Sequence, residues 1–187
     1  QYQKICYYKA VQLYNDGLFT ESISLFDKAI KVQNSSKLLY DSYYWRGEAY
    51  YQLNKFKSAL SSFQKIDVSS ERYFESLYQQ GYCYLKSSQY EKSIDFFSRA
   101  LQYNKDTNIL HDIYVRIADS WFALGDYDSA SKMYQESLMI QGFQSDYAAY
   151  QKSISYVLLE NYSAAINSFN YLIQTYPKSN YLDDAFF

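Results

Sequence analysis

The sequence predicts an all-α fold, an α-solenoid of antiparallel helix pairs with about five repeats and the start of a sixth. Three observations lead to this prediction. The 187-residue chain is self-similar with a period of about 34 residues. Aromatic and small residues recur at helical spacing within each period. The chain also holds only five glycines and one proline, which argues against a turn-rich sheet fold and against long linkers.

The second helix of each repeat carries an aromatic residue, a small residue three positions later and another aromatic residue four positions after that. Spacings of three and four place all of them on one helical face, which neighbouring helices can bury. Five stretches share this pattern: 15–30, 52–66, 86–101, 123–138 and 158–173. The residues expected on the buried face are Phe19, Ser22, Phe26, Phe56, Ala59, Phe63, Tyr90, Ser93, Phe97, Tyr127, Ala130, Tyr134, Tyr162, Ala165 and Phe169.

A first helix with its own small residue is expected before each of these stretches. The small residues are Ala10, Gly47, Gly81, Ala118 and Ser153, separated by 37, 34, 37 and 35 positions. Each repeat is therefore a helix, a tight turn and a second helix. The two longer periods predict three extra residues in a helix or a loop, near 32–37 and 103–108.

The tight turn between the two helices needs a residue in the left-handed conformation. Gly17, Asn54 and Gly125 take up this conformation at low cost. Ser88 and Glu160 stand at the same position in the third and fifth repeats. We therefore expect those two turns to differ from the other three.

These repeats resemble the tetratricopeptide repeat family, whose pattern is W-x2-L-G-x2-Y, then A-x3-F, then P. In the second repeat the match is carried by Tyr43, Gly47, Tyr50, Ala59 and Phe63, and the fourth repeat matches at Tyr114, Ile117, Ala118, Trp121, Ala130 and Tyr134. The resemblance covers about 180 residues in five successive units. It implies a right-handed superhelix in which the first helices line a concave groove.

We expect one continuous array over 1–187, with no linker. The repeats are placed at 3–36, 40–73, 74–108, 111–144 and 146–179, and a sixth, truncated repeat at 180–187. Pro177 should end the last complete repeat. Ser179 or Asn180 should cap a new helix with Asp183 and Asp184 in its first turn.

The stretch 180–187 stops before its own turn, so the chain is interpreted as a fragment of a larger protein. Phe186 and Phe187 are expected to be exposed, because the helix that would cover them is missing. This end is therefore expected to pack loosely or to associate with another molecule, including a second copy of the chain.

Several classes of function are disfavoured by composition. The formal net charge of −2 and the absence of a basic stripe argue against nucleic-acid binding and against a polybasic membrane surface. No apolar run approaches the length of a membrane-spanning helix. Cys6 and Cys83 are expected to be buried free thiols, and no cofactor or metal is expected. His111, the only histidine, is expected to be solvated or capping, so catalysis is improbable.

The family resemblance implies that ligands bind in the groove, at fixed offsets from the small residue of each first helix. Tyrosine offers apolar contact and a hydroxyl at little entropic cost, which suits peptide binding. The groove is acidic and aromatic, so an extended segment with basic or apolar side chains is the expected ligand. The candidate residues are Tyr7, Tyr14, Asp41, Tyr44, Glu48, Tyr51, Glu75, Tyr78, Tyr82, Asp119, Phe122, Tyr147 and Tyr150.

The leading hypothesis is a non-enzymatic scaffold that binds a protein or peptide partner. One alternative is a glycan-binding module of a bacterial outer-membrane system, because tyrosine faces stack on sugars. Another is a spacer or self-association element. The stretch YPKSNYLDDA (176–185) is similar to the repeat junctions of the Tol–Pal accessory family and of outer-membrane assembly lipoproteins. That similarity implies a bacterial protein of the periplasm or cell envelope.

Overall fold

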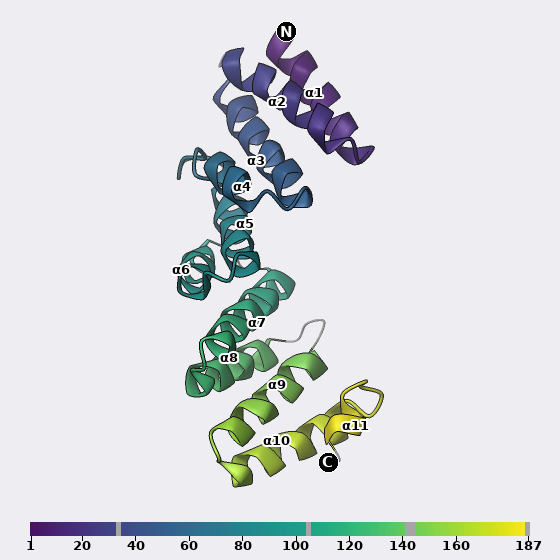
Figure 1. The fold of residues 1–187 in the computed structure, drawn as a ribbon, viewed down its shortest axis with the longest axis vertical. Coiled ribbons are helices and arrows are strands. Elements are labelled where there is room, and N and C mark those ends of the chain that lie inside the picture. Colours follow the sequence, from purple (N-terminus) through teal and green to yellow (C-terminus); the bar gives the residue numbers. More distant parts are fainter. Residues whose placement is uncertain (33–34, 104–105, 141–144, 186–187) are drawn as a thin grey trace. The chain divides into compact units, whose positions relative to one another are not determined.

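The structure is a computed structural model, and it describes residues 1–32, 35–103, 106–140 and 145–185 (Figure 1). Within these ranges the regular structure is helical and no strand occurs. The predicted all-α class is therefore confirmed. The chain divides into two compact units, Gln1–Gln89 and Tyr90–Phe187, and each is described by itself.

Antiparallel helices follow one another in both units, as Figure 1 shows. The first unit holds α1 (Tyr2–Asn15), α2 (Phe19–Val32), α3 (Ser36–Gln52), α4 (Phe56–Phe63) and α5 (Tyr73–Lys86). The second unit holds α6 (Tyr90–Ala100), α7 (Thr107–Ala123), α8 (Tyr127–Met139), α9 (Ser145–Leu158), α10 (Tyr162–Thr175) and α11 (Leu182–Ala185). Helices α3 and α7 have 17 residues, whereas α1, α5 and α9 have 14, so the three extra residues lengthen these first helices.

Small residues lie at the helix crossings because only short side chains let two helices approach closely. Ala10, Gly47, Gly81, Ala118 and Ser153 are all buried, as predicted. Their counterparts on the second helices, Ser22, Ala59, Ser93, Ala130 and Ala165, are buried too. The predicted aromatic residues Phe26, Phe63, Phe97 and Tyr134 are at most 1% exposed and fill the space between the helices. The predicted residues that are half-buried are Phe19, Phe56, Tyr90, Tyr127 and Phe169. The expectation for Tyr162 is wrong, because this first residue of α10 is 61% exposed.

Five turns of one geometry join first to second helices. Gly17, Asn54, Ser88, Gly125 and Glu160 have φ values of 76°, 56°, 55°, 80° and 56°. In each turn this residue donates its amide hydrogen three residues back, and the next residue donates five residues back. That pattern is the Schellman motif. The expectation that the turns at Ser88 and Glu160 differ is wrong, because both residues take the left-handed conformation and both turns make the same two backbone hydrogen bonds as the other three.

Side-chain caps start several helices. Ser35, Asp106, Asp126 and Asn161 accept hydrogen bonds from backbone amides in the first turns of α3, α7, α8 and α10. Each cap pairs an amide that has no partner within its own helix. These caps fix where the helices begin and therefore which residues their faces present.

Helix α10 ends at Thr175, two residues before Pro177, as the proline predicts. A short α11 follows with Asp183 and Asp184 in its first turn. The Ser179 hydroxyl accepts from the Tyr181 amide at 3.2 Å and donates to Asp146 Oδ2 at 2.9 Å, so it ties this segment to α9. The expectation for Phe186 and Phe187 lies outside the described residues, and the repeat boundaries given above stay a prediction.

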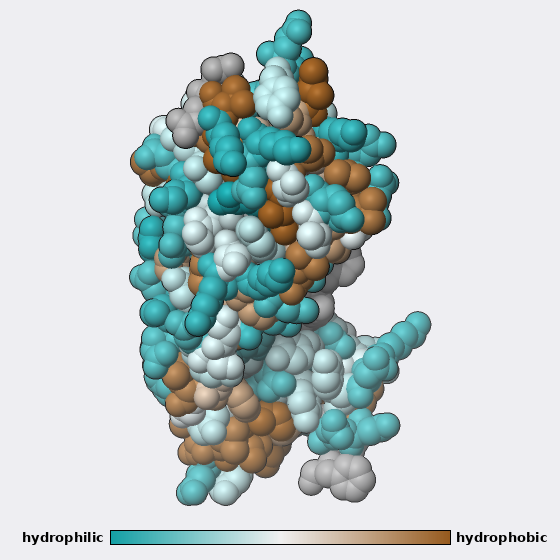
Figure 2. Space-filling view, turned by 45° about the horizontal axis from the view of Figure 1, so that its top comes forward, coloured by the Kyte–Doolittle hydropathy of each residue, from teal (hydrophilic) through white to brown (hydrophobic). Residues whose placement is uncertain are grey.

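The exposed faces mix polar and apolar side chains. Figure 2 shows hydrophobic areas separated by hydrophilic ones. Several exposed apolar residues lie at or near the turn between α9 and α10, namely Val157, Leu158, Leu159, Tyr162 and Ile166. No helix in the described ranges combines the length and the apolar character needed to cross a membrane.

Candidate functional site

The predicted site residues lie on first helices in both units. We call the residues on α1, α3 and α5 the first-unit cluster: Tyr7, Tyr14, Asp41, Tyr44, Glu48, Tyr51, Glu75, Tyr78 and Tyr82. We call the residues on α7 and α9 the second-unit cluster: Asp119, Phe122, Tyr147 and Tyr150. The two clusters belong to different compact units, and each is a separate candidate site.

Trp45 on α3 joins the aromatic residues of the first-unit cluster. Its ring centroid lies 5.1 Å from that of Tyr14 and 5.5 Å from that of Tyr44, both in edge-to-face geometry. Tyr44 also packs on the buried Phe63, with ring centroids 5.9 Å apart. Aromatic pairs at such distances and tilts attract one another beyond their shared burial. Trp45 was not among the predicted site residues, although it directly follows Tyr44 in the sequence.

Arg72 supplies the positive charge of the first-unit cluster. Its Nε donates to Asp41 Oδ1 at 2.7 Å, and its Nη1 lies 3.4 Å from Glu75 Oε1. The guanidinium also stands 4.9 Å from the centroid of the Tyr44 ring, within range of a cation–π interaction. The sequence prediction missed Arg72 because it is the residue before α5 and falls outside the helical offsets.

The remaining tyrosines of the first-unit cluster have mixed surroundings. Tyr78 and Tyr82 face each other on α5, with hydroxyls 3.5 Å and ring centroids 5.1 Å apart. Tyr51 packs edge-to-face on Phe56 of α4. Tyr7 is only 8% exposed and packs in the core with Cys6, Ala10, Phe26 and Ala29. Tyr44, Tyr78 and Tyr82 are half-buried and so keep part of their surface open to solvent.

Glu48 differs from the other acidic residues of the first-unit cluster. The residue is 8% exposed, and its Oε1 atom has no hydrogen-bond partner among the described residues. Burial raises its pKa to about 7. The pKa values of Tyr14, Tyr44 and the buried Cys83 thiol are raised as well, mainly by burial and second by the charge of Glu48. The pKa of Cys83 rises to about 12.

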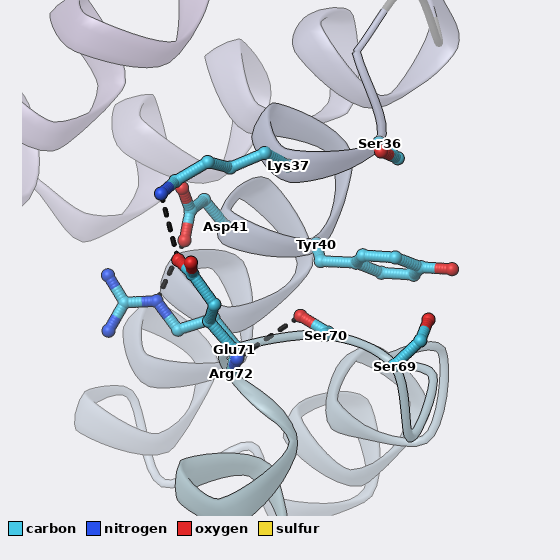
Figure 3. Close-up of a pocket in the computed structure, with 8 residues that line it drawn as sticks. All are labelled: Ser36, Lys37, Tyr40, Asp41, Ser69, Ser70, Glu71 and Arg72. Carbon is cyan, nitrogen blue, oxygen red and sulfur yellow. Dashed lines mark hydrogen bonds and ion pairs between the residues drawn. The ribbon is translucent and has the colours of Figure 1, made fainter.

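A pocket of about 270 Å³ lies beside the first-unit cluster, where the start of α3 meets the loop before α5 (Figure 3). Lys37 pairs with Glu71 across its rim at 2.8 Å, and the Asp41–Arg72 pair forms part of its wall. The other lining residues are Ser36, Tyr40, Ser69 and Ser70. Of all these residues only Asp41 belonged to the predicted site.

Asp119 organises the second-unit cluster. Its Oδ1 accepts hydrogen bonds from the hydroxyls of Tyr134 at 2.8 Å and Tyr147 at 2.9 Å, and its Oδ2 pairs with Arg116 at 2.8 Å. Arg116 also pairs with Asp112 at 3.1 Å. Burial and the Asp119 charge raise the pKa of both tyrosines, so their hydroxyls stay protonated donors.

The other residues of the second-unit cluster pack on neighbouring aromatic rings. Tyr150 stacks on Tyr181, with ring centroids 4.8 Å apart and an angle of 15° between the rings. Phe122 packs edge-to-face on Tyr127 of α8. A pocket of about 450 Å³ is lined by Arg116, Asp146, Tyr147, Asn180 and Tyr181. Of the residues predicted to bind a ligand, Tyr147 lines this pocket.

His111 departs in part from its prediction. It is 3% exposed, and its Nδ1 lies 2.9 Å from the carbonyl oxygen of Ser137, in the last turn of α8. The histidine is therefore not solvated, whereas its contact with a carbonyl oxygen in the last turn of α8 agrees with the expected capping role. Cys6 and Cys83 are buried free thiols, as predicted. In the part of the chain that the structure describes, no group of three or more His, Cys, Asp or Glu is arranged to hold a metal ion.

The fold is similar to several solved structures. The match to the crystal structure of MamA protein covers 95% of this chain and 93% of the MamA chain, with 18% sequence identity and a TM-score of 0.81. The match to MamA 41-end from Desulfovibrio magneticus RS-1 covers 96% of this chain and 98% of the MamA chain, with 13% sequence identity and a TM-score of 0.79. A third similar structure is YrrB, which is described as a tetratricopeptide-repeat protein with an unusual peptide-binding site. This match covers 90% of this chain and 84% of the YrrB chain, with 18% sequence identity and a TM-score of 0.72.

Sequence comparison adds a family. Curated protein sequences give no match. Family models described as tetratricopeptide repeat match residues 7–73, 74–107, 111–142 and 147–179. These segments follow one another along most of the chain. The chain belongs to the tetratricopeptide repeat family.

Proposed function

We propose that the chain is a non-enzymatic scaffold that binds an extended peptide or protein segment at the first-unit cluster. The observation that carries this proposal is the set of half-buried tyrosines on α3 and α5, Tyr44, Tyr78 and Tyr82, beside the Asp41–Arg72–Glu75 group. Half-buried tyrosines offer large contact areas whose rotamers are already restrained. The charged group adds hydrogen-bonding partners that fix the orientation of a bound backbone.

Two further considerations support a peptide ligand. Tetratricopeptide repeats commonly bind protein or peptide partners, and the similar structure YrrB is described as having a peptide-binding site. The acidic residues of the first-unit cluster outnumber its one basic neighbour, since Arg72 pairs with Asp41 and Glu75 and Glu48 is a third carboxylate. A segment with basic or apolar side chains therefore fits this surface better than an acidic one.

An array of capped 12-residue peptides of varied composition tests the proposal, with the purified chain as the soluble probe. The variant Tyr44→Ser/Tyr78→Ser/Tyr82→Ser should lose binding to the peptides that the native chain retains. The matched control is Tyr2→Ser/Tyr8→Ser, which changes two exposed tyrosines of α1 outside the first-unit cluster. Circular dichroism and urea unfolding identify any loss that comes from unfolding. Persistent binding by the folded triple variant would overturn the proposal.

The same proteins on a glycan array test the alternative of a glycan-binding module. Retention of glycans together with silence on the peptide array would favour that alternative. The similarity of the stretch 176–185 to envelope repeat proteins supports a place in the bacterial cell envelope. Fractionation of cells that express the tagged gene measures the compartment directly, and recovery in the cytoplasmic fraction alone would contradict this placement.

A further inference from the structure

A second pocket of the first unit lies between α3 and α4. We call it the α3–α4 pocket, and its volume is about 270 Å³. The pocket is open to solvent, since Lys57 and Ser61 are exposed and the Arg46 side chain keeps 18% of its surface accessible. Every lining residue is basic or carries a hydroxyl group, and none is acidic. These residues are Arg46, Tyr50, Lys57, Ser58, Ser61 and Ser62.

Arg46 is held at the wall of this pocket by three contacts. Its Nε donates to Ser62 Oγ at 3.1 Å, and its Nη1 donates to Asp27 Oδ1 at 2.6 Å. Its guanidinium also stands 5.2 Å from the centroid of the Tyr43 ring. A guanidinium has five N–H donors, so the two hydrogen bonds leave the others without a partner among the described residues. A side chain that is already fixed loses little entropy when it binds a ligand.

The charge of the α3–α4 pocket is positive. Asp27 on α2 offsets the charge of Arg46, whereas Lys57 forms no ion pair in the part of the chain that the structure describes. Lys57 is the second residue of α4, where α6 and α8 carry Glu91 and Asp128. A lysine at the start of a helix is repelled by the positive end of the helix dipole. An anion in the pocket would offset this repulsion.

We propose that the α3–α4 pocket binds a phosphate group. Two donors, the Arg46 guanidinium and the Tyr50 hydroxyl, come from α3. The Lys57 ammonium and the hydroxyls of Ser58 and Ser61 come from α4. A phosphate monoester carries about two negative charges near pH 7 and three strong acceptor oxygens, which donors on two helices can reach from different directions. A carboxylate is planar, has one charge and two oxygens, and would use fewer of these donors.

A titration of the purified chain followed by ¹H–¹⁵N NMR tests this proposal. The probes are inorganic phosphate and the N-acetyl methylamides of phosphoserine, glutamate and serine. At least one phosphate probe should bind about tenfold more tightly than the glutamate and serine probes, with shift changes centred on α3 and α4. The two phosphate probes distinguish the source of the group. Tighter binding of phosphoserine indicates a phosphorylated side chain, and equal or tighter binding of inorganic phosphate indicates the free ion.

Two single changes should act in opposite directions. Lys57→Gln removes a positive charge from the pocket and should weaken phosphate binding about fivefold or more. Asp27→Asn removes the charge that competes for Arg46 and should strengthen phosphate binding about twofold or more. A variant that fails to fold could not produce such a gain. Lys65→Gln and Glu21→Gln make the same charge changes at exposed positions outside the pocket, and each should change the affinity less than about twofold.

The phosphate site is overturned if neither phosphate probe binds, or if the glutamate probe binds as tightly as both of them. It is also overturned if Lys57→Gln and Asp27→Asn leave the affinity unchanged, or if the control variants change it as much. None of the lining residues belongs to the first-unit cluster, so the peptide-binding proposal does not depend on this result.

Discussion

A Cβ atom placed on Gly47 would lie 2.5 Å from Cε1 of Phe63, because the backbone of α3 rests directly on that ring. Phe63 is fully buried, so the ring has little room to move. Gly47→Ala should therefore lower the free energy of unfolding by about 1–3 kcal/mol, the usual cost of overpacking. Urea unfolding followed by circular dichroism measures the change.

A second variant checks the physical reason for this loss. Gly47→Ala/Phe63→Leu replaces the ring by a smaller side chain, and it should lose less stability than the sum of the two single changes. Additive losses would mean that the contact between Gly47 and Phe63 is not what limits the residue at position 47. Ala10 and Ala118 occupy the equivalent positions of two other repeats, so alanine is compatible with the repeat itself.

Ser88→Gly and Glu160→Gly should stabilise the chain. Both residues hold the left-handed conformation, with φ of 55° and 56°, and a side chain in that conformation costs about 1–2 kcal/mol. Glycine removes this strain but loses more entropy on folding, so the expected gain is about 0.5–1 kcal/mol for each change. Gly125→Ala, with φ of 80°, is the reverse change and should destabilise. Thermal unfolding that showed no gain at either site would contradict the strain argument.

The pair between Asp41 and Arg72 should stabilise the first unit. A double-mutant cycle with Asp41→Asn and Arg72→Gln is expected to give a coupling energy of about 1–2 kcal/mol, because the two side chains are mostly buried and 2.7 Å apart. The Lys37–Glu71 pair is the matched control. Its side chains are 70% and 82% exposed, so its cycle should show no measurable coupling. Equal coupling in both cycles would mean that burial does not set the strength of these pairs.

The stability of the chain should fall with rising pH through the titration of Glu48. Its pKa is about 7 in the folded chain, against an ordinary value of 4.5. The carboxyl therefore contributes stability that is complete below pH 4.5 and is lost as the pH rises through about 7. Glu48→Gln does not titrate, so at pH 8 it should be more stable than the native chain by about 1–3 kcal/mol. An identical pH dependence in both proteins would refute this.

The helix pairs could be predicted from the sequence because their signals are local. Aromatic and small residues at spacings of three and four mark the buried faces, and Pro177 marks the end of α10. The turns at Ser88 and Glu160 could not be predicted in this way. Their left-handed conformation goes with two backbone hydrogen bonds that close the end of the preceding helix, and the preference of a single residue does not signal these bonds.

The candidate site could be predicted only in part for a related reason. Helical offsets locate residues on a face, but they do not state which side chains of neighbouring helices meet there. Arg72 lies in a loop and reaches Asp41 across 31 positions, and no pattern on one helix signals such a contact. His111 similarly bonds to Ser137, 26 positions away, instead of facing solvent. Such long-range pairs depend on how the repeats stack.

The position of Trp45 among tyrosines has an optical consequence. The sequence holds two tryptophans, Trp45 in the first unit and Trp121 in the second, where it packs beside the core around Tyr134. Excitation at wavelengths that tyrosine does not absorb selects the indole rings. With Trp121→Phe, the emission would then report on the first-unit cluster alone, and with Trp45→Phe it would report on the second unit alone. The chain thus carries one tryptophan fluorophore for each unit, without any added dye.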